Sequence, residues 1–289
     1  MSSAAVAPRH ASSTGQAMTG VGWLDVHFES FRPEYEAQLR AVGIQSGWRV
    51  LDAACGSGSF LPWLAELVGP TGRLAALDLA PDNVAATEGR LAGWGLPCPV
   101  AMQVGTVLDL PYPDASFDAV WFANTAQYLT DDELATALAE FRRVVRPGGL
   151  VAVKESDLIR VLPAPPGLVL HHLELTAKGG NRQRQGVLRN ATLPDWLRRA
   201  GLGSVQRRTT LMPRAAPLPP ATRQLCRSYL GMYAAEAVAL DLPAADHACW
   251  ASLRDPAALE RLLDDPDFYF GEGNILVVGR VPGGAAPLD

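Results

Sequence analysis

The sequence has few cysteines and no long apolar run. The four cysteines are far apart and show no C-x-x-C spacing. They are Cys55, Cys98, Cys226 and Cys249. This spacing predicts neither a metal site nor a disulfide framework, and it favours a cytoplasmic location. No segment approaches the apolar length of a membrane span, and residues 1–20 lack the apolar stretch of a signal peptide. We therefore expect no membrane partner, a disordered tail over residues 1–20 and a short tail over residues 284–289.

Lysine is also scarce, and acidic residues outnumber basic ones. Lysine occurs only as Lys154 and Lys178, and 25 Lys and Arg residues against 30 Asp and Glu residues give a formal net charge of -5. A protein that binds a nucleic-acid backbone usually carries a basic patch, so we expect no nucleic-acid partner. With 289 residues, 48% of them hydrophobic, the chain can form one large domain or a core with a cap.

One glycine is missing from a loop that otherwise resembles a nucleotide site. Residues 50–58 read Val-Leu-Asp-Ala-Ala-Cys-Gly-Ser-Gly, an apolar run followed by Asp52 and by two glycines, Gly56 and Gly58. A pyrophosphate site needs a third glycine, but Leu61 stands there. The charge of Asp52 opposes an anion and attracts a cation, such as the sulfonium and ammonium groups of S-adenosylmethionine. Such a turn binds its ligand at the carboxyl end of a strand.

Short apolar runs alternate with helical segments after Gly47, which is typical of βαβ units. The candidate strands are residues 49–51, 74–77, 100–104, 119–122, 150–153, 204–211 and 274–281. They predict an α/β fold with a Rossmann-like, mostly parallel, seven-stranded sheet and helices on both faces. The clearest helix opens at Asp131, and we expect Pro147-Gly148-Gly149 to end it.

The chain divides into a core and an α-helical cap. Helical spacing with Pro33 near a first turn predicts N-terminal helices over residues 21–46, before a core at residues 47–156. The remaining segments are a helical acceptor-binding segment (157–203), a strand (204–212), a helical insertion (213–270) and a final strand (271–283). An insertion of that length between two strands is typical of a substrate lid.

Asp78 ends the second candidate strand. A carboxylate at this point can accept hydrogen bonds from both hydroxyls of a ribose. The alternative is a helix cap, because Asp82 and Asn83 follow shortly.

Three further motifs follow in order. Gly105-Thr106-Val107 comes after the third strand, Phe117-Asp118 opens the fourth, and Arg146-Pro147-Gly148-Gly149 precedes the fifth. Together with the glycine loop, they resemble a class I S-adenosylmethionine-dependent methyltransferase over residues 47–156. The chain is similar to the branch that holds the ubiquinone/menaquinone-type enzymes and many small-molecule, natural-product methyltransferases. The resemblance implies S-adenosyl-L-methionine as the cofactor.

The resemblance also implies a cofactor site. Its expected residues are Asp52, Ala54, Gly56 and Gly58 for the methionyl part, Asp78 for the ribose, Leu79 for the adenine, and Thr106, Val107, Asn124 and Gln127 around them. Thr106 and Val107 stand where the family commonly has Asp-Ala, whose acid often contacts the adenine amino group. Here the threonine hydroxyl or a backbone group must make that contact instead. The segment from Asn124 to Tyr128 differs from the Asn-Pro-Pro-Tyr of amino-group methyltransferases, which argues against DNA-base methylation.

A general base is needed only where the acceptor must lose a proton. The candidate catalytic residues are Tyr128, His27, Glu155, His171 and His172. Tyr128 would orient an acceptor by hydrogen bonding, or it would simply pack under the following helix. The alternative for each histidine is an ordinary surface or helix position.

Aromatic residues are the candidates for the acceptor pocket. In similar enzymes the N-terminal helices fold over the cofactor, which would place His27 and Tyr35 at the site. Trp23, Phe28 and Phe31 would shield the sulfonium through cation–π attraction, or pack in the core. The expected acceptor-binding residues are Tyr35, Tyr128, Tyr229 and Tyr233, with Met232 beside the last two. The alternative for the stripe of Tyr229, Met232 and Tyr233 is a buried helix face.

The predicted function is methyl transfer from S-adenosylmethionine to an O, N or C nucleophile of a small, partly apolar acceptor in secondary metabolism. The aromatic content of the cap and the negative net charge favour a small molecule. One alternative is a non-methylating enzyme or regulatory protein that retains the cofactor on the same fold. The other is a nicotinamide-dependent oxidoreductase, against which the charge of Asp52 argues. The sequence makes no prediction of the oligomeric state.

Overall fold

The computed structural model describes residues 21–283, and for residues 21–23 it describes the backbone alone. Its strands are β1 (Arg49–Ala53), β2 (Arg73–Asp78), β3 (Val100–Val104), β4 (Phe117–Ala123), β5 (Val145–Leu162), β6 (Gly203–Ala215) and β7 (Tyr269–Arg280). They form one seven-stranded sheet in the order β3-β2-β1-β4-β5-β7-β6. Strands β1 to β5 pair in parallel, and β7 is antiparallel to both of its neighbours. The predicted tails lie outside the described residues.

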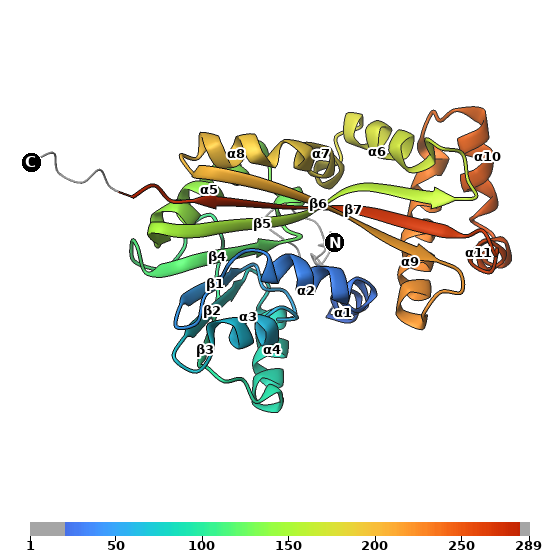
Figure 1. The fold of residues 1–289 in the computed structure, drawn as a ribbon. Coiled ribbons are helices and arrows are strands. Elements are labelled where there is room, and N and C mark those ends of the chain that lie inside the picture. Colours follow the sequence, from blue (N-terminus) through green and yellow to red (C-terminus); the bar gives the residue numbers. More distant parts are fainter. Residues whose placement is uncertain (1–20, 284–289) are drawn as a thin grey trace, which may run out of the picture.

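Helices cover both faces of this sheet (Figure 1). On one face lie α1 (Val21–Ser30), α2 (Arg32–Arg40), α3 (Leu61–Val68), α4 (Pro81–Trp94) and α9 (Pro220–Glu236). On the other lie α5 (Asp131–Val144), α6 (Leu168–Lys178), α7 (Arg182–Arg189) and α8 (Leu193–Arg199), while α10 (Ala244–Ser252) and α11 (Pro256–Leu263) cluster at one end. Three short 3-10 turns are η1 (Ala126–Tyr128), η2 (Asn190–Thr192) and η3 (Ala237–Ala239). The predicted α/β architecture is confirmed.

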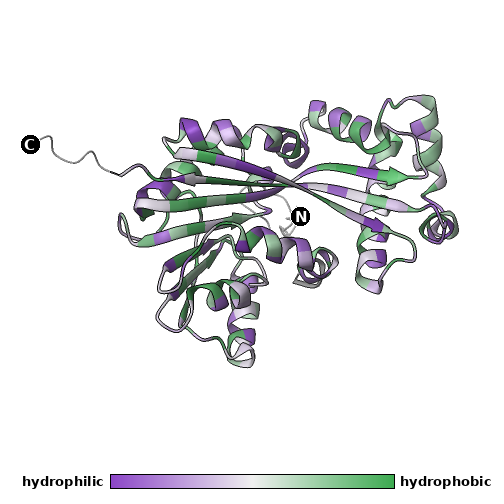
Figure 2. Ribbon diagram, viewed as in Figure 1, coloured by the Kyte–Doolittle hydropathy of each residue, from purple (hydrophilic) through white to green (hydrophobic). Residues whose placement is uncertain are grey.

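The core strands form because their residues are apolar on both faces. Strands β1 and β4 are buried almost throughout, as parallel strands covered by helices must be. Figure 2 shows the hydrophobic colouring of β4 and β5 where they cross the core. The core is therefore split by the sheet into two layers of buried side chains, one under α2 and α3 and one under α5 and α8.

Helix α5 begins as predicted but ends earlier. Thr130 and Glu133 form a capping box at its start. The helix ends at Val144, because Val145 already pairs with Phe117 of β4. The expectation that Pro147-Gly148-Gly149 ends it is therefore wrong, since these residues form an irregularity within β5. Gly149 is required there because a Cβ would lie 2.5 Å from the carbonyl oxygen of Asp118.

The cap contains more strand than predicted. Residues 157–162, 213–215 and 269–270, expected to be helical, belong to β5, β6 and β7. In β5 burial alternates, with Ile159 and Val161 buried and Leu158 and Leu162 exposed, which is a strand pattern of period two. Pairing with β7 supplies the backbone hydrogen bonds that keep this stretch extended. The cap is therefore a three-stranded antiparallel extension of the sheet, surrounded by α6, α9, α10 and α11 (Figure 1).

The predicted N-terminal helical region is two helices. The chain breaks at Phe31, and Pro33 lies in the first turn of α2 as expected. Arg214 of β6 fixes the break, because its guanidinium donates to the carbonyl oxygen of Ser30 and forms an ion pair with Glu34 at 2.7 Å. The N-terminal helices are thereby attached to the cap.

Helix α7 packs directly on the backbone of η1. Gly186 permits this contact, since a Cβ at that position would lie 2.0 Å from the carbonyl oxygen of Gln127. Arg189 of the same helix donates to the carbonyl oxygens of Ala126 and Leu129. The segment after β4 is thus held in place by a helix that lies sixty residues further along the chain.

We expect Gly186→Ala to lower the free energy of unfolding by about 1–3 kcal/mol, as overpacking of a close contact typically does. Urea denaturation measures the change. The matched control is Gly89→Ala in α4, where a Cβ meets nothing within 4 Å. That control should gain about 0.5–1 kcal/mol from the better helix propensity of alanine. Equal stability of the two variants would contradict the close packing of α7 on η1.

Candidate active site

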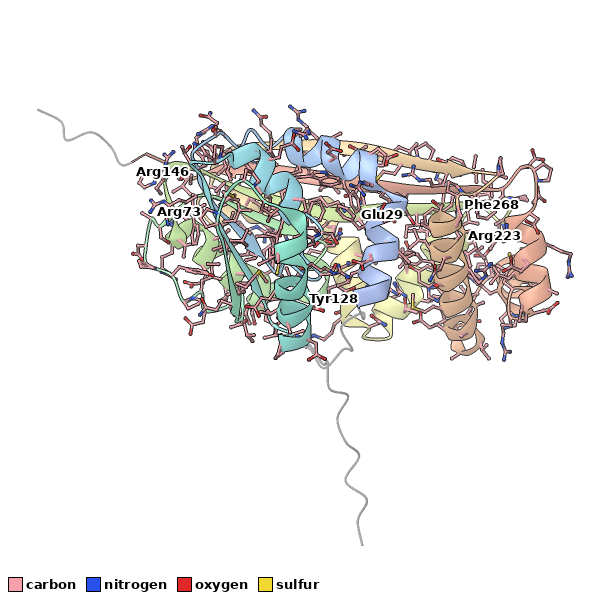
Figure 3. All side chains as sticks on the ribbon, turned by 90° about the horizontal axis from the view of Figure 1, so that it is seen from below. Glu29, Arg73, Tyr128, Arg146, Arg223 and Phe268 are labelled. Atoms are coloured by element: carbon pink, nitrogen blue, oxygen red, sulfur yellow. The ribbon has the colours of Figure 1, made fainter. Side chains whose placement is uncertain are left out.

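A cavity of about 450 Å³ lies at the carboxyl ends of β1, β2 and β4, the place where open α/β sheets bind ligands. Helices α1, α7 and α9 complete its walls. In Figure 3 Tyr128, which lines it, stands between the core half, marked by Arg73 and Arg146, and the cap half, marked by Arg223 and Phe268. The predicted residues that line it are Asp52, Ala54, Gly56, Asp78, Leu79, Thr106, Val107, Asn124 and Gln127, together with His27, Tyr35, Tyr128 and Tyr229.

The glycine loop turns with three residues at positive φ. Ala54 has φ 60°, Gly56 has φ 57° and Gly58 has φ 74°. Ala54 adopts the left-handed conformation despite its Cβ, a strain of about 1–2 kcal/mol that is typical of functional sites. Gly58 does not line the cavity. Its missing side chain makes room for α4 instead, since a Cβ would lie 2.5 Å from Cγ2 of Thr87.

Asp52 carries a carboxylate oxygen without a partner. The residue is buried, and its Oδ2 has no hydrogen bond within residues 21–283. Desolvation, and then the neighbouring charge of Asp78, raise its pKa to about 8. A buried acid that lacks a donor is suited to an incoming cation. This oxygen is chemically suited to an ammonium group, and its contact with S-adenosylmethionine stays a prediction.

Asp78 ties the glycine loop to the start of α4. Its Oδ2 accepts from the backbone N–H of Gly56 at 2.8 Å, which holds the glycine loop. Its Oδ1 accepts from the N–H of Ala80 and from Nδ2 of Asn83, which fixes the start of α4. A carboxylate has about four acceptor sites, so roughly one remains for a ribose hydroxyl. The N-cap of α4 is Ala80 and makes no side-chain capping bond, so Asp78 is not the helix cap. Ribose binding stays a prediction.

Helix α1 lies over the glycine loop. Asp25 forms an ion pair with Arg90 of α4 at 2.7 Å and accepts from Oγ of Ser57 at 3.0 Å. A Cβ on Gly56 would lie 3.2 Å from Cδ1 of Leu24. Phe28 lines the cavity, whereas Phe31 is fully buried and packs against Phe270 in the core. The side chain of Trp23, the third aromatic residue predicted there, is outside the described part of the chain.

Asn124, which directly follows β4, forms a polar contact with the buried Lys154 of β5. Asn124 has φ 55° and accepts at Oδ1 from Nζ of Lys154 at 2.7 Å. The same ammonium lies 3.5 Å from the centroid of the Tyr35 ring, a cation–π distance. Lys154 is fully buried, which lowers its pKa despite the nearby charges of Glu272 and Glu155.

Tyr128 faces the cavity, and its hydroxyl accepts from Nε2 of Gln183 at 3.2 Å. Desolvation raises its pKa to about 12, so the phenol keeps its proton at neutral pH. Tyr128 can therefore donate a hydrogen bond to an acceptor, but it cannot act as a base there.

The candidate general bases are spread over the molecule. His27 lines the cavity, but desolvation and the charge of Lys154 lower its pKa to about 3. Glu155 lies below the cavity, where its Oε1 accepts from the N–H of Ala126 at 2.5 Å. Burial raises its pKa to about 7. The carboxylate thus anchors η1.

His171, His172 and Tyr233 do not line the cavity. His171 contacts the buried carboxylate of Asp246 between α6 and α10. His172 stacks on Tyr233 at 4.5 Å between ring centroids, and burial lowers its pKa to about 4. Tyr233 accepts a hydrogen bond from Arg184. All three side chains pack within the cap. The expectation that they lie at the site is therefore wrong.

Several cavity residues were missed from the sequence. Arg184 and Gln183 of α7, Ser156 of β5 and Ser228 of α9 all line the cavity. Arg184 is 3% exposed and its Nε has no hydrogen bond within the described chain. No sequence motif marks these residues. Once the fold is known, Arg184 can be found because it lies two positions before Gly186, where α7 contacts η1.

The strand order and the loop at the end of β1 define a class I, Rossmann-like fold with a site for a cationic nucleoside cofactor. Residues 50–149 match a family model described as a methyltransferase domain. Residues 50–149 therefore form a methyltransferase domain, and S-adenosyl-L-methionine, the expected cofactor, is the cofactor of this class I fold.

Curated relatives match less than half of the chain. The chain is 34% identical over 122 residues to a demethylmenaquinone methyltransferase of Geobacillus kaustophilus, covering 42% of this chain and 51% of that one. It is 38% identical over 117 residues to a ubiquinone/menaquinone biosynthesis C-methyltransferase, UbiE, of Cupriavidus taiwanensis, covering 40% and 46%. The chain thus spans about half the length of the curated relatives it matches.

A solved structure extends the likeness of the fold into the cap. Phosphoethanolamine N-methyltransferase 2 of Haemonchus contortus, in complex with phosphomonomethylethanolamine and S-adenosylhomocysteine, superposes with a TM-score of 0.55 at 16% identity. The match covers 91% of this chain and 58% of that one. At this identity the likeness shows the fold alone.

We expect Asp52→Asn to have opposite effects on binding and on stability. Because folding raises the pKa of Asp52 from 3.8 to about 8, the ligand-free chain loses stability as the pH rises through that range. The asparagine removes this loss, so the free energy of unfolding near pH 7 should increase. S-adenosylhomocysteine, which keeps the ammonium group, should bind about 10- to 100-fold more weakly by calorimetry.

Asp118→Asn is the matched control. Asp118 lies at the opposite end of the sheet, where its carboxylate accepts from the N–H of Arg49 and from Nε of Arg146. This variant should lose stability and keep its affinity for S-adenosylhomocysteine. Unchanged affinity in Asp52→Asn would refute the ammonium site.

Proposed function

We propose that the protein transfers a methyl group from S-adenosylmethionine to a nucleophile of a small, partly apolar acceptor. The observation that carries this proposal is one continuous cavity. It is lined both by Asp52, whose Oδ2 has no hydrogen bond within the described residues, and by aromatic rings from α1, α2 and α9. A volume of about 450 Å³ is in the range of small-molecule sites.

The donor half of the cavity is formed by the ends of β1, β2 and β3. We assign the ammonium group to Asp52 and one ribose hydroxyl to Asp78. The adenine would lie between Leu79 and Val107, which line the cavity on two neighbouring loops. Thr106 accepts from the N–H of Leu108 at 3.2 Å, which leaves its hydroxyl proton for a ring nitrogen.

The acceptor half is more aromatic than polar. Its rings come from Phe28, Tyr35, Phe60, Tyr128 and Tyr229, and its polar side chains come from Ser156, Gln183 and Arg184. Such walls favour a flat, partly apolar molecule with a few oxygen atoms. The relatives are named for menaquinone and ubiquinone synthesis, which supports a hydroquinone-type acceptor.

The bound cofactor supplies a methyl group on a sulfonium, whose sulfur is a good leaving group. The residues of the chain have mainly to position the acceptor, since correct alignment provides much of the acceleration. Tyr128 keeps its proton and donates a hydrogen bond to an oxygen of the acceptor. The rings of Phe28 and Phe60 exclude water from the reacting groups.

We also propose a role in secondary metabolism and a cytoplasmic location. A role in secondary metabolism is supported by the cap, because the family match ends at residue 149. A cytoplasmic location is supported by the four free cysteines. Within residues 21–283, no helix has both the length and the apolar character needed to cross a bilayer.

The test is a turnover assay that detects release of S-adenosylhomocysteine. We expect release when the full chain is incubated with S-adenosylmethionine and reduced naphthoquinones or other phenols, and a much lower rate with Asp52→Asn. Mass spectrometry of the acceptor should show a gain of one methyl group. A chain that binds neither S-adenosylmethionine nor S-adenosylhomocysteine by calorimetry would refute the proposal.

A further inference from the structure

A buried acid lies directly behind a hydroxyl that lines the acceptor half of the cavity. Ser156 lines the cavity, and its Oγ donates to Oε1 of Glu272 at 2.7 Å. Glu272 is fully buried, and its Oε2 has no hydrogen bond within the described residues. A buried carboxylate with unused acceptor capacity is costly to keep, so a role in the site would explain it.

A bulge in the sheet produces this arrangement. Ser156 pairs with Asn274 of β7, and the register then shifts so that Ile159 pairs with Glu272. Bulges re-aim side chains, and they are frequent next to active sites. Asn274 fixes the acid from the same strand, because its Nδ2 donates to Oε1 of Glu272 at 3.1 Å.

Charged and titratable groups surround Glu272 from every neighbouring element. Lys154 of β5 and Arg214 of β6 favour its ionised form. Tyr35 of α2 and Tyr229 of α9 face it with phenol groups. Burial outweighs the two cations and raises the pKa of Glu272 above its usual value. An acid with a raised pKa is a better proton acceptor near neutral pH than an ordinary carboxylate.

The other acids and bases near the site are less suited to take a proton. His27 is a weak base, because its pKa is lowered to about 3. The carboxylate of Glu155 accepts from backbone N–H groups of η1 and, unlike Glu272, from no hydroxyl of the described residues that lines the cavity. Lys154 donates to Asn124 from below the Tyr35 ring.

We propose that Ser156 and Glu272 form a proton relay that deprotonates the acceptor, and that the acceptor is therefore a phenol-type hydroxyl compound. The proposal rests on the function proposed above. The O–H bond of the acceptor breaks, and its electron pair stays on the acceptor oxygen. The released proton passes to Oγ of Ser156, while the hydroxyl proton of Ser156 passes to Oε1 of Glu272. The acceptor becomes a phenolate, and Glu272 becomes a neutral acid.

The experiment uses 4-nitrophenol as the probe, because its visible absorption distinguishes phenol from phenolate. The full chain is saturated with S-adenosylhomocysteine and titrated with the probe near neutral pH. We expect the wild-type chain to bind the probe largely as phenolate. In Glu272→Gln, and equally in Ser156→Ala, the ratio of bound phenolate to phenol should fall at least about tenfold, which corresponds to one pKa unit.

The matched control is Asp246→Asn, which removes another buried carboxylate, outside the cavity, and should leave the ratio unchanged. Affinity for S-adenosylhomocysteine reports whether each variant is folded. If Glu272→Gln does not fold, the result for Ser156→Ala alone decides. An unchanged ratio in Glu272→Gln overturns the role of the acid, and an unchanged ratio in Ser156→Ala overturns the relay. A wild-type complex that binds S-adenosylhomocysteine but not the probe overturns the acceptor class. Failure to bind S-adenosylhomocysteine counts against the proposed function instead.

Discussion

The rest of the structure depends on the antiparallel pairing of β7 between β5 and β6. The β5–β7 ladder runs from the pair Leu150 and Arg280 in the core to the pair Leu162 and Tyr269 in the cap. Backbone hydrogen bonds along this ladder make core and cap one continuous sheet, so the cap helices are held at a fixed place above the carboxyl ends of β1 and β4. The cavity lies between the two parts because one ladder joins them.

The same ladder explains why so much charge is buried near the cavity. Lys154 and Glu272 come from its two strands, and neither is exposed. Burying ionisable groups costs free energy unless they are paired, so the site is less stable than an apolar core of the same shape would be. The left-handed backbone of Ala54 and Asn124 adds strain at the ends of β1 and β4. The free energy of unfolding is therefore lowered by the residues around the cavity, where methyl donor and acceptor would meet.

The core and the cap form different parts of the cavity. The family match covers residues 50–149, which include the loop that is suited to the cofactor. The acceptor half depends instead on α7, α9 and the extended part of β5, which lie beyond that match. A fold of this kind supports many acceptors because the cap can change while the cofactor loop is kept.

The sequence by itself determined where the seven strands lie and that the glycine loop after the first strand lines the cavity. These features are local, because an apolar strand, a carboxylate and a turn follow one another directly. It placed His171, His172 and Tyr233 at the site wrongly, since helical periodicity does not say which neighbour a helix face meets. It also missed the strand at residues 157–162, whose extended form depends on pairing with β7. Only the tertiary structure brought Ser156 to Glu272, 116 positions away, and Arg184 to the cavity. Such contacts depend on strand register and on the bulge, which are set by the packing of the whole sheet and not by any neighbouring residues.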